Sequence, residues 1–136
     1  MSVDEKTPVA ILLSEGQRHD APQGRILLES FGSVSEILER YNKDPDASIT
    51  LIADKAHEGN KTRKLAILLG YDLCIPPKAN RIDPWEYDEK LYKRRNEIER
   101  LIRRVKEYRR VFTRYDKLDI MYIGFLLFGF IVEAFR

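Results

Sequence analysis

The sequence has few of the residues that build disulfide frameworks and zinc sites: one cysteine and two histidines in 136 residues. A single thiol, Cys74, excludes an internal disulfide, and one cysteine with two histidines falls short of the usual ligand set of a structural zinc. Cys74 also lies in the apolar run YDLCI. This context predicts a buried and inert thiol, not a nucleophile.

Long apolar runs are also scarce. The longest, Ile120–Val132, is shorter than the roughly 20 residues that a membrane span needs, and Asp119 and Glu133 close it at both ends. A buried final helix is the preferred interpretation, with a membrane segment as the alternative. The charged start, Met1 to Lys6, lacks the apolar stretch of a secretory leader, so none is expected.

The net charge of +2 hides an uneven distribution. Residues 1–60 carry more acids than bases, whereas residues 88–117 are strongly basic. The bases of this block are Lys90, Lys93, Arg94, Arg95, Arg100, Arg103, Arg104, Lys106, Arg109, Arg110, Arg114 and Lys117. Such a block is typical of a protein that binds a phosphate backbone, although a solvated helix face with ion pairs has the same composition.

Hydrophobic periodicity predicts alternating strands and helices. Expected strands are Thr7–Ser14, Ser48–Ala53 and Asp72–Ile75, the first being one arm of a hairpin. Expected helices are Pro22–Tyr41, with a break at Gly32-Ser33, then Gly59–Leu69, Asp88–Tyr115 and Leu118–Phe135. The order indicates one α/β layered domain, with a strand and helix core in residues 1–87 and the basic and apolar helices in residues 88–136.

Asp54 directly follows the apolar strand Ser48–Ala53. Open α/β sheets usually carry their chemistry at such strand ends, but on spacing alone the preferred interpretation is that Asp54 only caps the segment that follows. The pair His19-Asp20 has a similar ambiguity between an acid/base pair and a helix cap, and the cap at Asp20 is preferred because Ala21-Pro22 comes next.

One polar stripe stands out on the predicted basic helix. At about 100° per residue, Tyr92, Arg95, Glu99 and Lys106 fall within a stripe roughly 60° wide. The stripe flanks the apolar face, which consists of Leu91, Ile98, Leu101, Ile102, Val105 and Phe112. A carboxylate among these basic residues is therefore expected to face a cleft.

The spacing Y-x2-R-x3-E-x6-K of this stripe resembles the signature of DDE-type insertion-sequence transposases. Three other stretches are similar to segments of the same family: GQRHDAPQ at Gly16–Gln23, LIADKAHEGN at Leu51–Asn60 and CIPPKANR at Cys74–Arg81. A fourth, Tyr87–Leu118, carries the whole signature and the tail that follows it in the family. Together they cover nearly the whole chain. One departure lies at His57-Glu58, where the family usually has tyrosine and aspartate.

The resemblance implies an RNase H-like catalytic core that cuts and joins DNA strands with Mg²⁺ or Mn²⁺. It implies that Asp54 and Glu99 are two of three metal-binding acids, since hard divalent ions prefer carboxylate oxygens. Tyr92, Arg95 and Lys106 would contact phosphate or DNA beside them. Further contacts to the DNA backbone are assigned to Arg103, Arg104, Arg109 and Arg110.

The family's first acid is expected upstream of the segments found here, so the chain resembles the C-terminal part of such a catalytic domain. Asp4 corresponds to a non-catalytic acid and is not assigned to the site. We therefore expect the polypeptide alone to be inactive, either as the downstream half of a split transposase or as a decayed remnant.

The resemblance also implies the partners of the chain. These are DNA, at transposon ends and target, and the upstream half of the split transposase. An uncovered sheet edge also favours a homo-oligomer. The location implied is the bacterial cytoplasm, at the nucleoid when DNA is bound.

Two other classes of function remain open. A non-catalytic DNA-binding module would use the basic helix alone and be indifferent to Glu99. A helical interaction or membrane-associated protein would use the apolar final helix and its basic neighbour.

Overall fold

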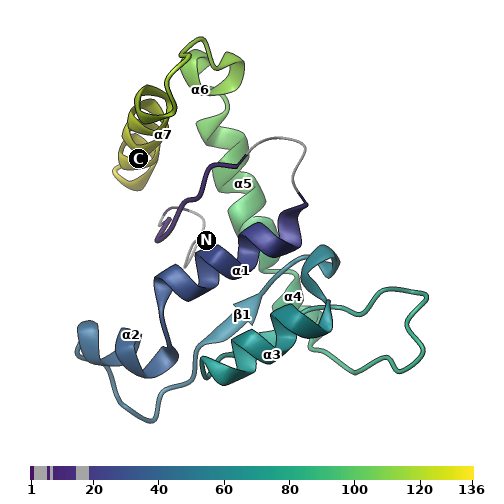
Figure 1. Ribbon diagram of the computed structural model, residues 1–136. Coiled ribbons are helices and arrows are strands. Elements are labelled where there is room, and N and C mark those ends of the chain that lie inside the picture. Colours follow the sequence, from purple (N-terminus) through teal and green to yellow (C-terminus); the bar gives the residue numbers. More distant parts are fainter. Residues whose placement is uncertain (2–5, 7, 15–18) are drawn as a thin grey trace. The chain divides into compact units, whose positions relative to one another are not determined.

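The computed structural model describes residues 1, 6, 8–14 and 19–136 (Figure 1). The expected turn at Asp4 and residues 15–18, which include the start of the Gly16–Gln23 motif, lie outside the described residues. The chain forms two compact units. Residues Ser14–Arg95 are called the sheet unit, and Met1–Leu13 with Asn96–Arg136 the helical unit.

The sheet unit is built on two parallel strands, β1 (Thr50–Ile52) and β2 (Asp72–Cys74), with Leu51 paired to Leu73. Helix α3 (Asn60–Leu68) connects them, after a short 3₁₀ turn, η1 (Lys55–His57). Both strands were predicted, and both are shorter than the apolar runs that contain them. The β-helix-β order brings the carboxyl ends of both strands to one edge, where Asp54 and Ile75 leave the sheet.

Gly70 follows α3 just beyond its C-cap, Leu69, close to the end of the helix predicted over Gly59–Leu69. Its φ of 86° is a left-handed conformation that favours glycine, and its N–H donates to the carbonyl of Ile67 at 2.9 Å. The next residue, Tyr71, is buried, and its hydroxyl donates to the carbonyl of Gly32 at 2.8 Å. Gly70 therefore reverses the chain after α3, so that β2 can begin at Asp72.

The predicted break at Gly32-Ser33 is confirmed, since α1 (Asp20–Phe31) ends there and α2 (Val34–Arg40) begins after Ser33. Ser33 and Glu36 form a capping box at the start of α2. The cap predicted at Asp20 is wrong. Helix α1 begins at Asp20 itself, and His19 is the N-cap, without a side-chain hydrogen bond. The carboxylate of Asp20 therefore lies in the first turn, where its negative charge interacts favourably with the helix dipole.

The single long helix predicted over Asp88–Tyr115 is wrong. The chain forms α4 (Glu89–Tyr92), α5 (Arg95–Val105) and α6 (Arg109–Thr113), separated by turns. In the first turn the N–H of Arg94 bonds the carbonyl of Leu91, three residues back instead of four. In the second, Tyr108 takes an extended conformation as the N-cap of α6.

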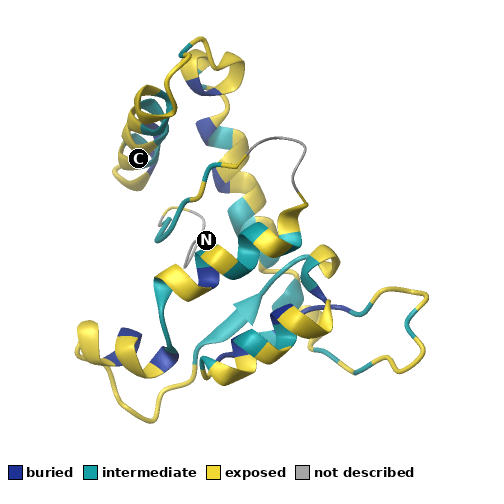
Figure 2. Ribbon diagram, viewed as in Figure 1, coloured by how far each residue is buried: buried dark blue, intermediate teal, exposed yellow. Residues whose placement is uncertain are grey.

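The second turn changes which residues enter the core of the helical unit. Leu101, Val105 and Val111 form a buried cluster with Leu126 and Phe130 packed on it (Figure 2, dark blue positions on α5 and α6). On an unbroken helix Phe112 would continue the face of Leu101 and Val105. Because the turn rotates α6, Val111 is buried and Phe112 is 72% exposed, which corrects the predicted apolar face.

The predicted final helix is confirmed as α7 (Asp119–Ala134). It approaches the core closely at Gly129, where a Cβ atom would lie 3.3 Å from Val105 Cγ1. Much of its apolar surface is exposed, including Ile120, Phe128 and Phe135. Among the helices that the structure describes, none combines the length and the hydropathy needed to cross a membrane.

The strand predicted over Thr7–Ser14 does not form in its described part, Pro8–Ser14, which has a single bridge residue at Pro8. The described backbone contacts of this segment are the N–H of Val9 donating to the carbonyl of Met1 at 3.0 Å and the amino group of Met1 donating to the carbonyl of Ala10 at 2.7 Å. A strand requires a partner along its length, and one short pairing at the chain start does not supply it.

Candidate nucleic-acid and metal site

Asp54 lies at the carboxyl end of β1, two residues after the strand ends. Its Oδ1 accepts from the N–H of Ala56 at 3.1 Å and caps η1, and its Oδ2 lies 3.3 Å from Arg95 Nη1. The side chain is nevertheless 47% exposed. Both interpretations of Asp54 therefore have a structural basis: it is a cap, and it presents a half-exposed carboxylate where α/β sheets carry their chemistry.

Two residues of the predicted signature lie beside Asp54. Arg95, the first residue of α5, pairs with Asp54, and its guanidinium carbon is 5.6 Å from the centre of the Tyr92 ring. Tyr87 packs edge-on against Tyr92, with ring centres 5.6 Å apart. Burial raises the pKa of Tyr92, while Arg95 opposes the increase, so the phenol remains a neutral hydrogen-bonding group at neutral pH. The sequence thus correctly anticipated the neighbourhood of Tyr92 and Arg95, although the helix that joins them is broken.

The other two residues of the signature, Glu99 and Lys106, belong to the helical unit. They line one surface hollow of about 440 Å³ together with Arg103. Ile102, Glu107 and Phe112 complete its walls. The helical periodicity had predicted Phe112 to be in the core. The structure places it instead in the wall of this hollow.

Arg104 differs from its neighbours, because it serves the packing of α7. Its Nε donates to Oε2 of Glu133 at 2.8 Å, and Glu133 also accepts from the Tyr108 hydroxyl at 3.0 Å and from Arg136 at 3.2 Å. Glu133 is only 2% exposed. Burial acts to raise the pKa of Glu133, but the three donors outweigh it and hold the pKa below its usual value.

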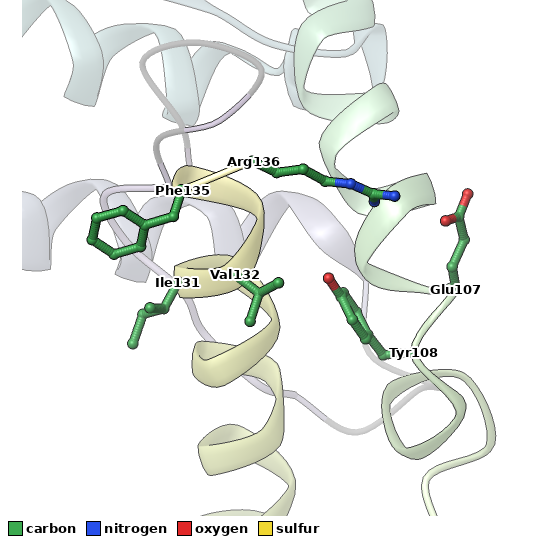
Figure 3. Close-up of a pocket in the computed structure, with 6 residues that line it drawn as sticks. All are labelled: Glu107, Tyr108, Ile131, Val132, Phe135 and Arg136. Carbon is green, nitrogen blue, oxygen red and sulfur yellow. The ribbon is translucent and has the colours of Figure 1, made fainter.

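A larger hollow of about 680 Å³ lies next to this buried network, and Figure 3 shows Tyr108 directed toward α7, which carries Val132, and toward Arg136, which follows the end of that helix. Glu107, Ile131 and Phe135 complete its lining. None of the residues predicted for metal or DNA borders it, and its walls are largely apolar. It is therefore not the candidate site.

Arg109 and Arg110, both predicted to bind DNA, stack on aromatic rings. The guanidinium carbon of Arg109 is 5.6 Å from the centre of Tyr115, and that of Arg110 is 4.5 Å from the centre of Phe125 on α7. Arg110 also lies 3.7 Å from Asp116. These contacts fix both side chains, while leaving them largely exposed.

No helix or strand was predicted for residues 78–87, and the sequence analysis missed a cationic cluster around the aromatic ring of this segment, Trp85. Trp85 contacts both Arg63 and Arg81, whose guanidinium carbons are 3.5 Å and 4.4 Å from its ring centre. Glu58 is buried and binds Arg81 and Lys78. The available signal was a lone tryptophan four residues after an arginine, with Glu58 at the position where the sequence departs from the family.

With this geometry established, a comparison with protein families gives a match over residues 1–127 to the family described as Transposase DDE domain. The chain belongs to this family. The resemblance derived from the four motifs is thereby confirmed. No curated protein and no solved structure matched the chain.

Membership of the Transposase DDE domain family implies an RNase H-like fold, and the mixture of helices with a small parallel sheet does not conflict with it. It supports a transposase activity in general and implies a DNA substrate. Domains of this family generally use divalent metal ions. Within the described part of the chain, however, no three His, Cys, Asp or Glu side chains are grouped so that they could hold a metal ion.

Proposed function

We propose that this chain is the part of a DDE transposase catalytic domain that supplies two of its metal-binding acids, Asp54 and Glu99, for cutting and joining DNA strands. The observation that carries the proposal is the convergence of Asp54, Tyr92 and Arg95. Asp54 and Arg95 are 41 residues apart in the sequence, yet they form an ion pair at the carboxyl end of β1. Tyr92 joins them through Arg95.

The metal would be Mg²⁺ or Mn²⁺, which prefer carboxylate oxygens. When bound, such ions activate an attacking oxygen and stabilise a leaving oxygen at a phosphodiester. Asp54 and Glu99 are of the right chemical type, but two carboxylates are fewer than the three that the family uses. The 136-residue chain by itself is therefore proposed not to cleave DNA, and the third acid would come from an upstream half of a split transposase.

DNA binding is proposed for Tyr92, Arg95 and Lys106 beside the acids, and for Arg103, Arg104, Arg109 and Arg110 along the backbone. Their contacts suggest an order of importance. Arg103 and Lys106 are exposed beside Glu99 in the same hollow, so they can approach a phosphate directly. Arg104 holds the buried Glu133, and Arg109 and Arg110 stack on rings, so each would contact DNA with only part of its donors.

A second candidate function is a DNA-binding remnant without catalysis. The observation that favours it is that the described residues lack a three-membered group of metal ligands, while the basic surface around Arg103 and Lys106 remains. In both cases DNA at the bacterial nucleoid is the partner, and a homo-oligomer would cover a sheet edge that has no neighbouring strand among the described residues.

Binding of Mn²⁺, followed by electron paramagnetic resonance, separates the two functions. If Asp54 and Glu99 are ligands, D54N and E99Q each weaken Mn²⁺ binding, whereas the control D46N, in an exposed turn, leaves it unchanged. Mn²⁺ binding that is the same in all three variants and the parent would disprove the metal assignment and leave the remnant function.

The DNA assignment is tested separately by the dependence of duplex affinity on salt. Replacing both Arg103 and Lys106 by glutamine should reduce the slope of log K against log salt by about two, since each released counterion contributes roughly one. If DNA binding is absent in the parent, or is unaffected by the double replacement, this part of the proposal fails.

A further inference from the structure

The cationic cluster around Trp85 is the strongest feature that the proposed site leaves unexplained. It contains three bases, Arg63, Lys78 and Arg81, and one acid, Glu58. Among the described residues Glu58 is the carboxylate that pairs with Lys78, at 3.8 Å, and with Arg81, at 2.6 Å. The cluster therefore has two more positive than negative charges, and its geometry is held by a single tryptophan.

Every element of the cluster comes from the carboxyl end of the sheet. Glu58 follows β1, four residues after Asp54, and the loop with Lys78 and Arg81 follows β2 (Figure 1). The indole N–H of Trp85 donates to the carbonyl of Ile75 at 2.8 Å, which ties the far end of this loop to the end of β2. The excess charge is thus built into the same edge of the sheet as Asp54.

The guanidinium of Arg63 is held in an unusual position. It lies 3.5 Å from the centre of the Trp85 ring. Burial lowers the pKa of Arg63, and the nearby charge of Arg81 lowers it further, while Glu58 acts in the opposite direction. Two guanidiniums that share one ring repel each other, and an anion placed between them would remove that repulsion.

Arg81 also donates from Nη2 to Oδ1 of Asn60. Two further observations concern hydrogen-bond donors of this cluster that have no side-chain acceptor among the described residues. Helix α3 begins after Gly59, without any side chain capping its first N–H groups, so these donors point out of the helix beside Arg63. The Nε of Arg81 is buried, and within the described residues it has no hydrogen-bond partner. A ligand that brings several acceptor oxygens and negative charge matches both features.

We propose that Arg63, Lys78 and Arg81, gathered around Trp85, form a phosphate-binding site that takes a backbone phosphate of DNA. The inference rests on the proposed function, because the DNA is the substrate of the Asp54 edge. It adds a contact on the sheet unit that is separate from the basic residues of α5 and α6. Glu58 acts as a positioning residue, since it holds Lys78 and Arg81 and does not face the anion.

The position of Trp85 provides a direct measurement, since it is the only tryptophan in the chain. Fluorescence of Trp85 should change when a short DNA duplex is titrated in, and R63Q should weaken this response about tenfold, the effect of losing one charged hydrogen bond. The slope of log K against log salt is negative, and its magnitude should decrease by about one in R63Q. R63K, which keeps the charge, should keep the slope.

The matched control is K43Q, which removes a positive charge from an exposed turn that precedes β1, at the opposite end of that strand. It should change neither the fluorescence response nor the slope. Lys78 is 52% exposed on its side chain, so K78Q serves as a second variant if R63Q fails to fold. It is expected to reduce the slope in the same way.

Four outcomes are distinguishable. A reduced slope and a weakened Trp85 response in R63Q and K78Q support the site. DNA binding by the parent without any Trp85 response, and with an unchanged slope in both variants, overturns this site while the function stands. A Trp85 response to inorganic phosphate but not to the duplex overturns the assignment to DNA. If the parent binds no DNA at all, the proposed function and this inference both fail.

Discussion

Two carboxylates, one in each unit, are held in opposite ways. Asp54 at the end of β1 is half-exposed and has one backbone donor and one arginine. Glu133 in α7 is almost completely buried and has three side-chain donors. The contrast teaches that exposure, and not the number of partners, marks the acid that can still accept a ligand. Glu133 is committed to the fold, whereas Asp54 has surface left for a metal ion or solvent.

The largest expected effect comes from removing the buried acid. E133A should lower the free energy of unfolding by about 3–5 kcal/mol, because it leaves Arg104 without its buried partner. Urea unfolding measures this change. The control E107A removes an exposed glutamate from the same unit and should stay within about 0.5 kcal/mol of the parent. Equal effects of the two variants would show that the network around Glu133 does not stabilise the fold.

Acid should weaken the same network. Since the pKa of Glu133 is lower in the folded chain than its usual 4.5, the stability it contributes is complete above that value. It is lost as the pH falls through the lower, folded pKa. E133Q, expected to cost about 1.5–3 kcal/mol at neutral pH, removes this part of the pH dependence. Unfolding curves of parent and E133Q that remain parallel down to about pH 3 would contradict the assignment.

Asp54 should matter much less for stability. D54A removes the cap of η1 and should cost about 1 kcal/mol. D54N retains a capping oxygen and should be nearly neutral, although it loses the charge. Thermal unfolding of the two variants checks the difference. If D54N were as destabilising as E133A, Asp54 would be as important for the fold as Glu133, and the contrast between the two carboxylates would be wrong.

The smallest effect is expected for the ion pair itself. R95Q breaks a pair whose side chains are 28% and 47% exposed, and such pairs contribute about 0.2–1 kcal/mol. High salt should reduce even this difference. A urea titration at low and high salt measures it. A loss of several kcal/mol, insensitive to salt, would show that Arg95 supports a buried network instead.

Much of the sheet unit could be predicted from the sequence. Apolar runs bounded by turn residues located β1 and β2, and Gly32 located a helix end because positive φ angles favour glycine. The motif at Leu51–Asn60 identified Asp54, and the structure supplies the pairing with Arg95 that spacing alone could not. These predictions succeeded because local backbone chemistry decided the outcome, although the cap assigned to Asp20 on the same kind of local signal was wrong.

The helical unit was harder to predict, because a tertiary contact overrides periodicity there. Residues 92–112 read as one amphipathic helix, but Tyr108 is drawn to Glu133 and the chain turns before α6. Glu133 was interpreted only as the end of an apolar run. A helical wheel assumes an unbroken axis, and it cannot show that Val111 is buried while Phe112 is exposed.

The connection between β1 and β2 has a consequence for the order in which the chain gains structure. Thr50 and Asp72 pair through one short helix, whereas Asp54 and Arg95 are 41 residues apart. Closing the shorter loop costs less entropy, and contacts between near neighbours in sequence generally form faster. During synthesis β1, α3 and β2 would also leave the ribosome before α4 and α5, which carry Tyr92 and Arg95. Asp54 is therefore expected to reach its position at the strand end early in folding, and Arg95 to form its ion pair with Asp54 later.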